Sequence, residues 1–233
     1  MNVKLLHITP IEIAVLAIRQ CYESMDKSDS VWTNENSNTH EYEYILGDKD
    51  KALIERVIES GHTSTLEHIN VTFKLENFTR DVLQELSRHR HASPSVKSTR
   101  YTLKELKSED SFLIVKEDED RGIFVEHNIE AASKYVELTG NDILDTAIIG
   151  CLEAIRISLA EGMTNDQVKP ALPEAYLVSS IFTINMRSLR NLLELRTSHR
   201  AYHKIRSLAY AMYNALPDSY KFMVDDCIAG EKV

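Results

Sequence analysis

The sequence predicts an α+β fold in which an antiparallel sheet packs with long helices inside a single domain that is not of the Rossmann type. Strict alternation of apolar and polar residues indicates strands, and apolar residues at every third or fourth position indicate helices. The two kinds of segment do not follow the strand–helix–strand order of a parallel sheet. The length of 233 residues suits one large domain, so we expect residues 1–233 to form one.

The N-terminal part is predicted to begin with a strand and a helix. Residues 2–8, NVKLLHI, are predicted as a short strand, and Pro10 suits the first turn of the helix that follows. Residues 26–47 are polar, and we expect a surface loop with some local order. An amphipathic helix should follow, with Asp48 as its N-cap and Gly61 just beyond its end.

The clearest strand is EHINVTFKLENF, residues 67–78. Its alternation places four apolar side chains on one face, namely Ile69, Val71, Phe73 and Leu75. Residues 79–90 return to helical spacing, with Thr79 as the expected cap. STRYTL (98–103) and SFLIV (111–115) are predicted as further strands.

The C-terminal part is predicted to be mainly helical. Residues 128–162 have helical spacing, with one apolar stripe made of Ile143, Ala147, Cys151, Ile155 and Leu159. LVSSIFTINM (177–186) is predicted as a strand, and RSLRNLLELR (187–196) as the helix after it. A last helix should end near Pro217.

Composition and charge narrow the class of protein. The formal net charge of −9 argues against a general nucleic-acid binder, which would carry a basic excess. The three cysteines, Cys21, Cys151 and Cys227, are widely spread and fit reduced thiols. No apolar run approaches a membrane span, and the N-terminus lacks a signal-peptide pattern. We therefore expect a cytoplasmic protein without a membrane partner and without a metal site.

Cations are concentrated in LSRHRHASPSVKSTRYTL, residues 86–103. The simplest interpretation is a basic helix end followed by a polar loop, because cations are favourable at a helix C-terminus. However, Arg88, Arg90 and Arg100 fall within thirteen residues and repel one another unless anions compensate them. Hydroxyl side chains lie between the arginines, and this combination binds phosphate well. The seven glycines form no G-x-G-x-x-G or Walker motif, so side chains would have to hold a nucleotide.

The same window contains R-H-R, seven further residues and a serine, and is followed by TRY. This pattern resembles the signature of the flavin-dependent thymidylate synthases. Residues 58–101 and 169–203 resemble the family in the right order, through SGHTSTLEHINVTF and LPEAYLVSSIFTINMRSLRNLLELR. The resemblance implies an FAD-dependent enzyme that converts dUMP to dTMP. It implies that 5,10-methylenetetrahydrofolate donates the methylene group, that FADH2 donates the hydride, and that NADPH reduces the flavin again. It also implies a homotetramer whose active sites are shared between chains.

The resemblance also implies roles for individual residues. Arg196 faces the uracil edge and stabilises the negative charge that spreads onto N3 and O4 as C5 becomes nucleophilic. The implied FAD-binding residues are His62, Ser64, Arg88, His89, Arg90, Val96, Asn185, Met186, Arg187, Asn191 and His199. The implied dUMP-binding residues are Gln84, Glu85, Arg88, Val96, Lys97, Ser98, Thr99, Arg100, Lys169 and Arg196. We assign Ser98 to binding, because an unassisted serine is a weak nucleophile.

The chain departs from the family pattern at several of these positions. Many members carry other residues at Gln84, Glu85, Ser95 and Val96, and an arginine where this chain has Lys169. Val96 offers only backbone groups, and a lysine lacks the bidentate fork of arginine. Some members have a histidine at the position that Arg200 occupies here, so His199 and Arg200 are both candidates for the role of that histidine.

Two other functions remain open from the residues alone. A binding module could use the arginines and hydroxyls of residues 88–100 to hold RNA or a phosphoprotein, with Tyr101 stacking on a base. A hydrolytic or metal enzyme could use the histidines, but no H-E-x-x-H motif occurs. None of the cysteines lies near the window, which favours a hydride route over attack on uracil by a thiolate.

Overall fold

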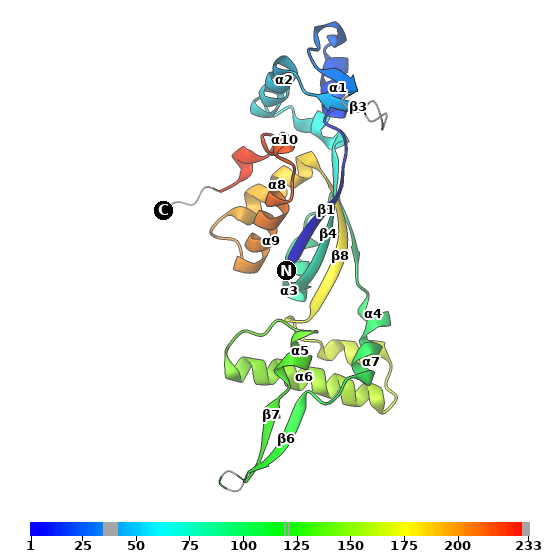
Figure 1. Cartoon of the computed structure of the whole chain (residues 1–233), viewed down its shortest axis with the longest axis vertical. Coiled ribbons are helices and arrows are strands. Elements are labelled where there is room, and N and C mark those ends of the chain that lie inside the picture. Colours follow the sequence, from blue (N-terminus) through cyan, green and yellow to red (C-terminus); the bar gives the residue numbers. More distant parts are fainter. Residues whose placement is uncertain (35–41, 119, 121, 230–233) are drawn as a thin grey trace. The chain divides into compact units, whose positions relative to one another are not determined.

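The computed structural model describes residues 1–34, 42–118, 120 and 122–229, and these form an α+β fold of helices and antiparallel sheets (Figure 1). Its strands are β1 Asn2–Ile8, β2 Val31–Asn34, β3 Tyr42–Ile45, β4 Asn70–Thr79, β5 Ala92–Val96, β6 Leu113–Asp118, β7 Gly122–His127 and β8 Leu177–Asn185. Its α-helices are α1 Glu12–Cys21, α2 Asp48–Glu59, α3 Arg80–Leu86, α4 Thr99–Thr102, α5 Ile129–Ser133, α6 Asp142–Ala160, α7 Asn165–Val168, α8 Met186–Thr197, α9 His203–Asn214 and α10 Asp218–Lys221. Short 3-10 helices are η1 Met25–Lys27, η2 Thr63–His68, η3 Leu103–Ser108, η4 Lys169–Ala171 and η5 Asp225–Cys227.

Two compact units divide the chain, and neither is continuous in sequence. The first unit contains Met1–Leu75, Arg88–Pro94 and Ile181–Val233, and the second contains Glu76–Ser87 and Ser95–Ser180. The boundary therefore falls within β4, β5 and β8. That residues 1–233 act as one domain stays a prediction.

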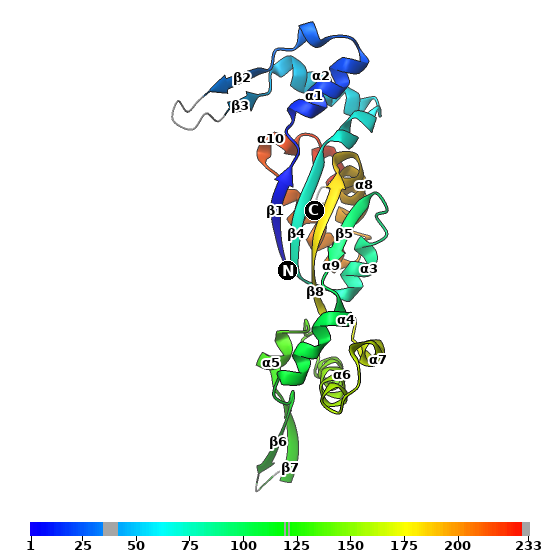
Figure 2. The ribbon, with the colours of Figure 1, turned by 90° about the vertical axis from the view of Figure 1, so that its right-hand side faces the viewer.

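The largest sheet has the strand order β1-β4-β8-β5 (Figure 2). Met186 donates its backbone N–H to the carbonyl of Ile69, and the hydroxyls of Thr72 and Thr183 are hydrogen-bonded at 3.0 Å. Because the residue numbers of these two pairs change in opposite directions, β4 and β8 are antiparallel. The predicted sheet is confirmed.

The core of the first unit follows the predicted alternation. Four side chains in and just before β4 are fully buried, namely Ile69, Val71, Phe73 and Leu75. Helix α8 buries Leu189, Leu192 and Leu193, and it packs against α9, which also contacts β1. Each such side chain contributes about 1.5–3 kcal/mol when it is fully buried. This burial fixes α8 firmly, which matters for the residues on its other face.

Helix α2 begins and ends where the sequence predicts, but its cap differs. Asp48 is the first helical residue, and Gly47 is the N-cap. The carboxylate of Asp29 accepts hydrogen bonds from the backbone N–H groups of Lys49 and Asp50, at 2.9 and 3.1 Å. Beyond the other end, Gly61 has a φ of +75°, which a glycine adopts without strain. The expected cap by Asp48 was thus wrong, because a carboxylate nineteen positions earlier supplies it.

The expected loop at residues 26–47 contains a hairpin. Strands β2 and β3 pair antiparallel, with Trp32 opposite Tyr44 and their ring centroids 5.2 Å apart. Residues 35–41 of the expected loop lie outside the described residues. Cross-strand aromatic pairs stabilise such ribbons, and the many polar residues around them concealed the strands.

The cationic window also differs from the prediction. Helix α3 ends at Leu86, where the Ser87 N–H bonds to the Leu83 carbonyl, so the basic residues lie beyond the last turn. Residues 92–96 form β5 rather than a loop, and residues 99–102 form α4 rather than a strand. The helix is explained by burial of Thr99, Leu103 and Leu106, which share a helical face.

The long helix α6 is rotated relative to the predicted stripe. It begins after Asn141, whose side chain accepts hydrogen bonds from the N–H groups of Ile143 and Leu144. It buries Ile149, Leu152, Ile155 and Leu159, so only the last two stripe residues are in the core. Ile143 is 81% exposed, and Cys151 is half-buried rather than in the core. Apolar residues on two faces made the buried face ambiguous in the sequence.

Candidate functional site

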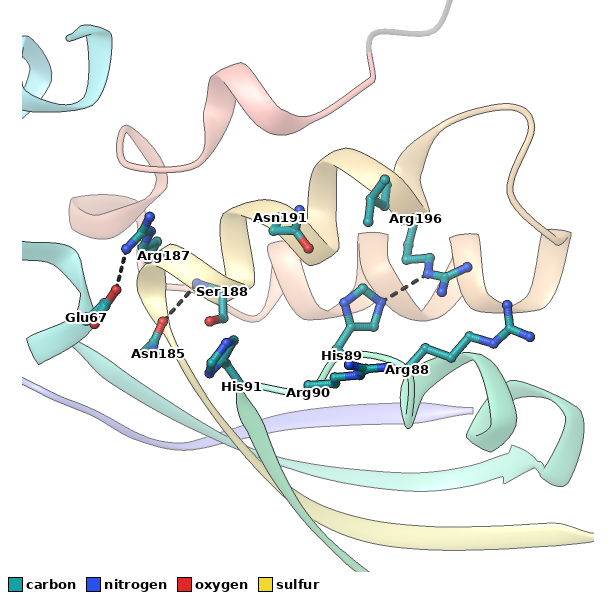
Figure 3. Close-up of a pocket in the computed structure, with 11 residues that line it drawn as sticks. Glu67, Arg88, His89, Arg90, His91, Asn185, Arg187, Ser188, Asn191 and Arg196 are labelled. Atoms are coloured by element: carbon teal, nitrogen blue, oxygen red, sulfur yellow. Dashed lines mark hydrogen bonds and ion pairs between the residues drawn. The ribbon is translucent and has the colours of Figure 1, made fainter. Parts of the chain in front are cut away.

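A cavity of about 640 Å³ in the first unit collects most of the predicted FAD-binding residues (Figure 3). We call it the arginine cavity. It is lined by Glu67, Arg88, His89, Arg90, His91, Asn185, Arg187, Ser188, Asn191, Leu195 and Arg196. These residues come from η2, from residues 88–91, and from the end of β8 with α8.

The start of α8 is fixed by its cap. Asn185 is the N-cap, and its side chain accepts a hydrogen bond of 2.8 Å from the backbone N–H of Ser188. From there, Ser188 and Asn191 face the cavity (Figure 3). Leu195, which also lines it, follows Asn191 at helical spacing on the same face. The opposite, buried face of α8 anchors this arrangement in the core.

Residues 88–91, which we call the arginine link, join α3 to β5. Within the described ranges, the guanidinium groups of Arg88 and Arg90 make no hydrogen bond or ion pair. Both side chains are exposed. Uncompensated guanidinium groups of this kind are available for an anionic ligand.

The charge of the cavity is strongly positive. It is lined by four arginines but by a single carboxylate, Glu67, which pairs with Arg187 at 2.5 Å (Figure 3). The neighbouring hydroxyl of Ser188 and amide of Asn191 add hydrogen-bond donors. Guanidinium forks with such donors fit a diphosphate, so these side chains fit the FAD that the sequence predicts.

Arg196 and His89 meet in the cavity. The Nε of Arg196 donates a hydrogen bond to Nε2 of His89, with 3.1 Å between the two nitrogens (Figure 3). The accepting ring nitrogen therefore carries no proton, and the bond helps to orient the guanidinium plane. A fixed guanidinium is what stabilisation of developing negative charge requires.

Several residues predicted to bind FAD lie elsewhere. His62 is the N-cap of η2 and Ser64 lies within it, and they line two other cavities of the first unit. Met186 is fully buried, and its backbone N–H donates a hydrogen bond to the carbonyl of Ile69. Val96 ends β5, and His199 is exposed in the turn after α8, as is Arg200. None of these five lines the arginine cavity.

Most of the predicted dUMP-binding residues lie in the second unit. Ser98 is the N-cap of α4, Thr99 is buried, and Lys97 pairs with Glu105 at 3.2 Å. Lys169 is exposed at the start of η4. In α3, Gln84 donates to Glu174 at 2.9 Å, and Glu85 is half-buried.

Arg100 makes the most defined contact of this set. Its Nε and Nη2 donate to the two carboxylate oxygens of Asp166, each at 3.0 Å. The backbone carbonyl of Arg100 also accepts a hydrogen bond of 2.7 Å from Asn165. The hydrogen bond from Arg100, together with its charge and that of Lys169, lowers the pKa of Asp166. A bidentate carboxylate thus occupies the fork that was predicted to hold phosphate.

Four residues that line the arginine cavity were not predicted from the sequence, namely Glu67, His91, Ser188 and Leu195. Ser188 and Leu195 could have been found from helical spacing, because they precede and follow Asn191 by three and four positions. His91 directly follows the R-H-R motif. Nothing in the sequence pattern placed Glu67 opposite Arg187.

Among the described residues, no group of three or more histidine, cysteine, aspartate or glutamate side chains is placed to hold a metal ion. No helix in the same residues is long and apolar enough to cross a membrane.

Comparisons with known proteins agree on one family. The family model described as "Thymidylate synthase complementing protein" matches residues 4–219. A flavin-dependent thymidylate synthase of Campylobacter jejuni (strain RM1221) is 42% identical over 229 residues, which cover 98% of each chain. One of Helicobacter pylori (strain ATCC 700392 / 26695) is 40% identical over 224 residues, covering 95% of this chain and 96% of the relative. The crystal structure of a Helicobacter pylori enzyme complexed with FAD and dUMP superposes with a TM-score of 0.82. It is 39% identical and covers 98% of this chain and 100% of the other.

Proposed function

The chain belongs to the flavin-dependent thymidylate synthase family, and from this premise we propose that the arginine cavity is where it binds FAD for the conversion of dUMP to dTMP. The observation that carries the assignment is the convergence of Arg88, Arg90, Arg187 and Arg196 on one cavity with a single carboxylate. The reaction takes a methylene group from 5,10-methylenetetrahydrofolate, and NADPH is the reductant. Bound FAD, once reduced, supplies the hydride.

The arginine link neutralises phosphate charge. Arg88 and Arg90 have no ionic partner among the described residues and are exposed toward the cavity. Ser188 and Asn191 on α8 supply further hydrogen bonds from a rigid helix. Phosphate recognition by side chains in this way needs no glycine-rich turn.

Arg196 acts on the uracil ring. As C5 of dUMP becomes nucleophilic, negative charge spreads onto N3 and O4, and a guanidinium facing that edge lowers the cost. The hydrogen bond to His89 restricts the directions in which the Arg196 side chain can point. His89 is therefore a positioning residue in this proposal, and Arg196 is the catalytic one.

Arg100 and Lys169 hold the phosphate of dUMP, with Ser98 and Thr99 beside them. This assignment rests on the family pattern and on the charge of both side chains. Asp166 is paired with Arg100 at 3.0 Å, and the charge of Lys169 contributes to its lowered pKa. Phosphate must therefore compete with a carboxylate for the guanidinium of Arg100.

We also infer a homo-oligomer, with four subunits as in the family pattern. Apolar side chains on two elements of the second unit are exposed to solvent in the single chain. Ile143 and Leu144 on α6 are 81% and 54% exposed, and Val115 and Ile123 in the β6–β7 hairpin are 69% and 74% exposed. Contact with other copies would bury these side chains. The three cysteines are free thiols, which supports a reducing compartment such as the cytoplasm.

The alternative of a phosphate- or RNA-binding module without redox chemistry receives no support from these comparisons. An absorbance spectrum separates the two. The purified protein, or the protein after addition of FAD, should show flavin absorbance and should form dTMP from dUMP. A colourless protein that does not bind added FAD would contradict the proposal.

Arg90→Ala tests the cavity itself. The variant should lose FAD on gel filtration more readily than the wild type, because a partner of the diphosphate is removed. Lys104→Ala is a matched control, since it removes one exposed cation from the second unit. Equal flavin content in all three proteins would overturn the assignment of Arg90.

A further inference from the structure

A second cavity of about 740 Å³ lies between α1 and α2 in the first unit and shares no lining residue with the arginine cavity. We call it the α1–α2 cavity. Five basic side chains line it and no carboxylate does; they are Arg19, Lys27, Lys49, Arg56 and His62. In a chain with a net charge of −9, this concentration is local and does not reflect the overall composition.

The charge of Arg19 is already compensated. Its Nε donates to Oδ1 of Asp50 at 2.5 Å, and the side chains of this pair are 5% and 0% exposed. Ser28 also donates to Asp50 at 2.6 Å, which holds the carboxylate in place. The pair is neutral, so Arg19 adds no net positive charge to the cavity that it lines.

The remaining cations have no such compensation. Lys27, Lys49 and Arg56 are exposed, and within the described ranges their side chains make no hydrogen bond or ion pair. Three like charges around one cavity raise the local electrostatic potential and attract an anion with several charges. Phosphate groups match both the ammonium and the guanidinium donors.

An aromatic side chain stands beside these cations. Tyr22 lines the same cavity and is 59% exposed, although a large ring is usually better covered. An exposed ring next to phosphate-binding cations is the arrangement on which a nucleobase stacks. Cations with a stacking ring favour a nucleotide over a simple anion.

The position of η2 connects this cavity to the proposed chemistry. His62, which precedes η2, lines the α1–α2 cavity, and Glu67 near the other end of η2 lines the arginine cavity. Five steps of a 3-10 helix cover about 10 Å, a distance that an extended dinucleotide spans. A nucleotide bound between α1 and α2 can therefore extend toward the arginine cavity.

We propose that the α1–α2 cavity binds a phosphorylated nucleotide, the adenosine-phosphate half of the NADPH that the reaction consumes. Lys27, Lys49 and Arg56 contact its phosphates, and Tyr22 stacks on the adenine. The identity of this nucleotide rests on the proposed function. The oligoglutamate tail of a folate shares the negative charge but has no base for Tyr22, and it is one outcome of the test.

The test is calorimetric titration of the flavin-loaded protein with 2′,5′-ADP. The triple variant Lys27→Gln, Lys49→Gln, Arg56→Gln should raise the Kd about tenfold, which corresponds to about 1.4 kcal/mol. A matched triple variant, Lys4→Gln, Lys104→Gln, Lys107→Gln, changes the net charge equally at exposed sites outside the cavity and should leave the Kd unchanged. Tyr22→Leu should weaken binding, whereas Tyr22→Phe should not.

Four results would overturn the proposal. The first two concern the Kd for 2′,5′-ADP: no change in the cavity variant, or an equal rise in the control variant. The third is binding of penta-γ-glutamate in place of 2′,5′-ADP. The fourth is a changed oligomer mass of the cavity variant in light scattering. The last would identify the cavity as an interface between copies. Because binding is measured without turnover, failure of dTMP formation would not affect this result.

Discussion

Arg196 and His89 are 107 positions apart in the sequence, yet they are joined by a hydrogen bond of 3.1 Å between Nε and Nε2 (Figure 3). One comes from the last turn of α8 and the other from the arginine link. Since Nε donates and the histidine ring accepts, the contact orients the guanidinium without neutralising its charge. It thereby joins the proposed catalytic arginine to the R-H-R motif.

Arg196→Ala should therefore abolish most turnover while leaving flavin bound. Loss of one fixed donor to a developing oxyanion costs about 10²–10³ in kcat. Flavin absorbance and single-turnover dTMP formation measure the two effects separately. Arg196→Lys keeps a charge but loses the planar group and should recover only part of the rate. Wild-type turnover in the alanine variant would remove Arg196 from the mechanism.

The sequence predicted elements well where one face alone is apolar. Val71, Phe73 and Leu75 alternate with polar residues, and β4 was correctly expected. Helix α6 was expected, but its buried face was not, because Ile143 is as apolar as Ile149 and only tertiary packing separates them. The predicted strand at 98–103 was wrong. Threonine and tyrosine side chains favour strands, but here burial of Thr99 and Leu103 stabilises helical turns.

The candidate site was predictable where its residues are close in sequence. The arginine link and the start of α8 each carry several cavity residues in a short run. Glu67 was missed because its partner Arg187 is 120 positions away and no local pattern connects them. The partner of Arg100 was missed for the same reason, since Asp166 lies 66 positions further along. Pairs made by tertiary packing leave no local signal in a single sequence.

None of the three cysteines should be needed for turnover. Burial raises the pKa of Cys227 to about 11, so this thiol is protonated at neutral pH. Cys21 is exposed, but none of the three lines the arginine cavity. Cys21→Ser, Cys151→Ser and Cys227→Ala should each keep kcat within about twofold, as expected when no interaction with the transition state is lost. Loss of dTMP formation without loss of folding in any of them would point to a thiolate mechanism.

Thiol labelling gives an independent check on the same residues. At pH 8 a disulfide reagent should modify Cys21 quickly and Cys227 only after unfolding, because reaction requires the thiolate and access to it. Rapid labelling of Cys227 in the folded protein would contradict its burial.

Glu153 should make folding sensitive to acid. It is 6% exposed, and its carboxylate accepts hydrogen bonds from Arg156, at 3.0 and 2.7 Å, and from the Phe112 N–H at 2.9 Å. The hydrogen bonds from Arg156 are the largest cause of its lowered pKa. Its stabilising effect is therefore fully present above the unfolded pKa of about 4.3 and is lost as pH falls through the lower folded value.

Glu153→Gln should lower the free energy of unfolding by about 2 kcal/mol at pH 7, as expected when a charged hydrogen-bond partner is lost. The difference from the wild type should shrink below about pH 4. Urea unfolding at pH 7 and pH 3.5 measures both. Glu161→Gln, an exposed position just after α6, is the control and should change little. A deficit of equal size at both pH values would show that packing, rather than ionisation, explains the loss.

Asp166 should compete with dUMP for Arg100. The two parallel 3.0 Å hydrogen bonds occupy the guanidinium edge that a phosphate would use, so binding of phosphate requires this pair to separate. Asp166→Asn removes the competing charge and should tighten dUMP binding severalfold, whereas Asp166→Glu keeps the charge and should not. Deoxyuridine, which lacks the phosphate, should bind equally to all three proteins. Equilibrium titration with both ligands checks this. Weaker dUMP binding by the asparagine variant would mean instead that Asp166 positions Arg100 in the complex, and unchanged binding would mean that Arg100 does not hold the phosphate.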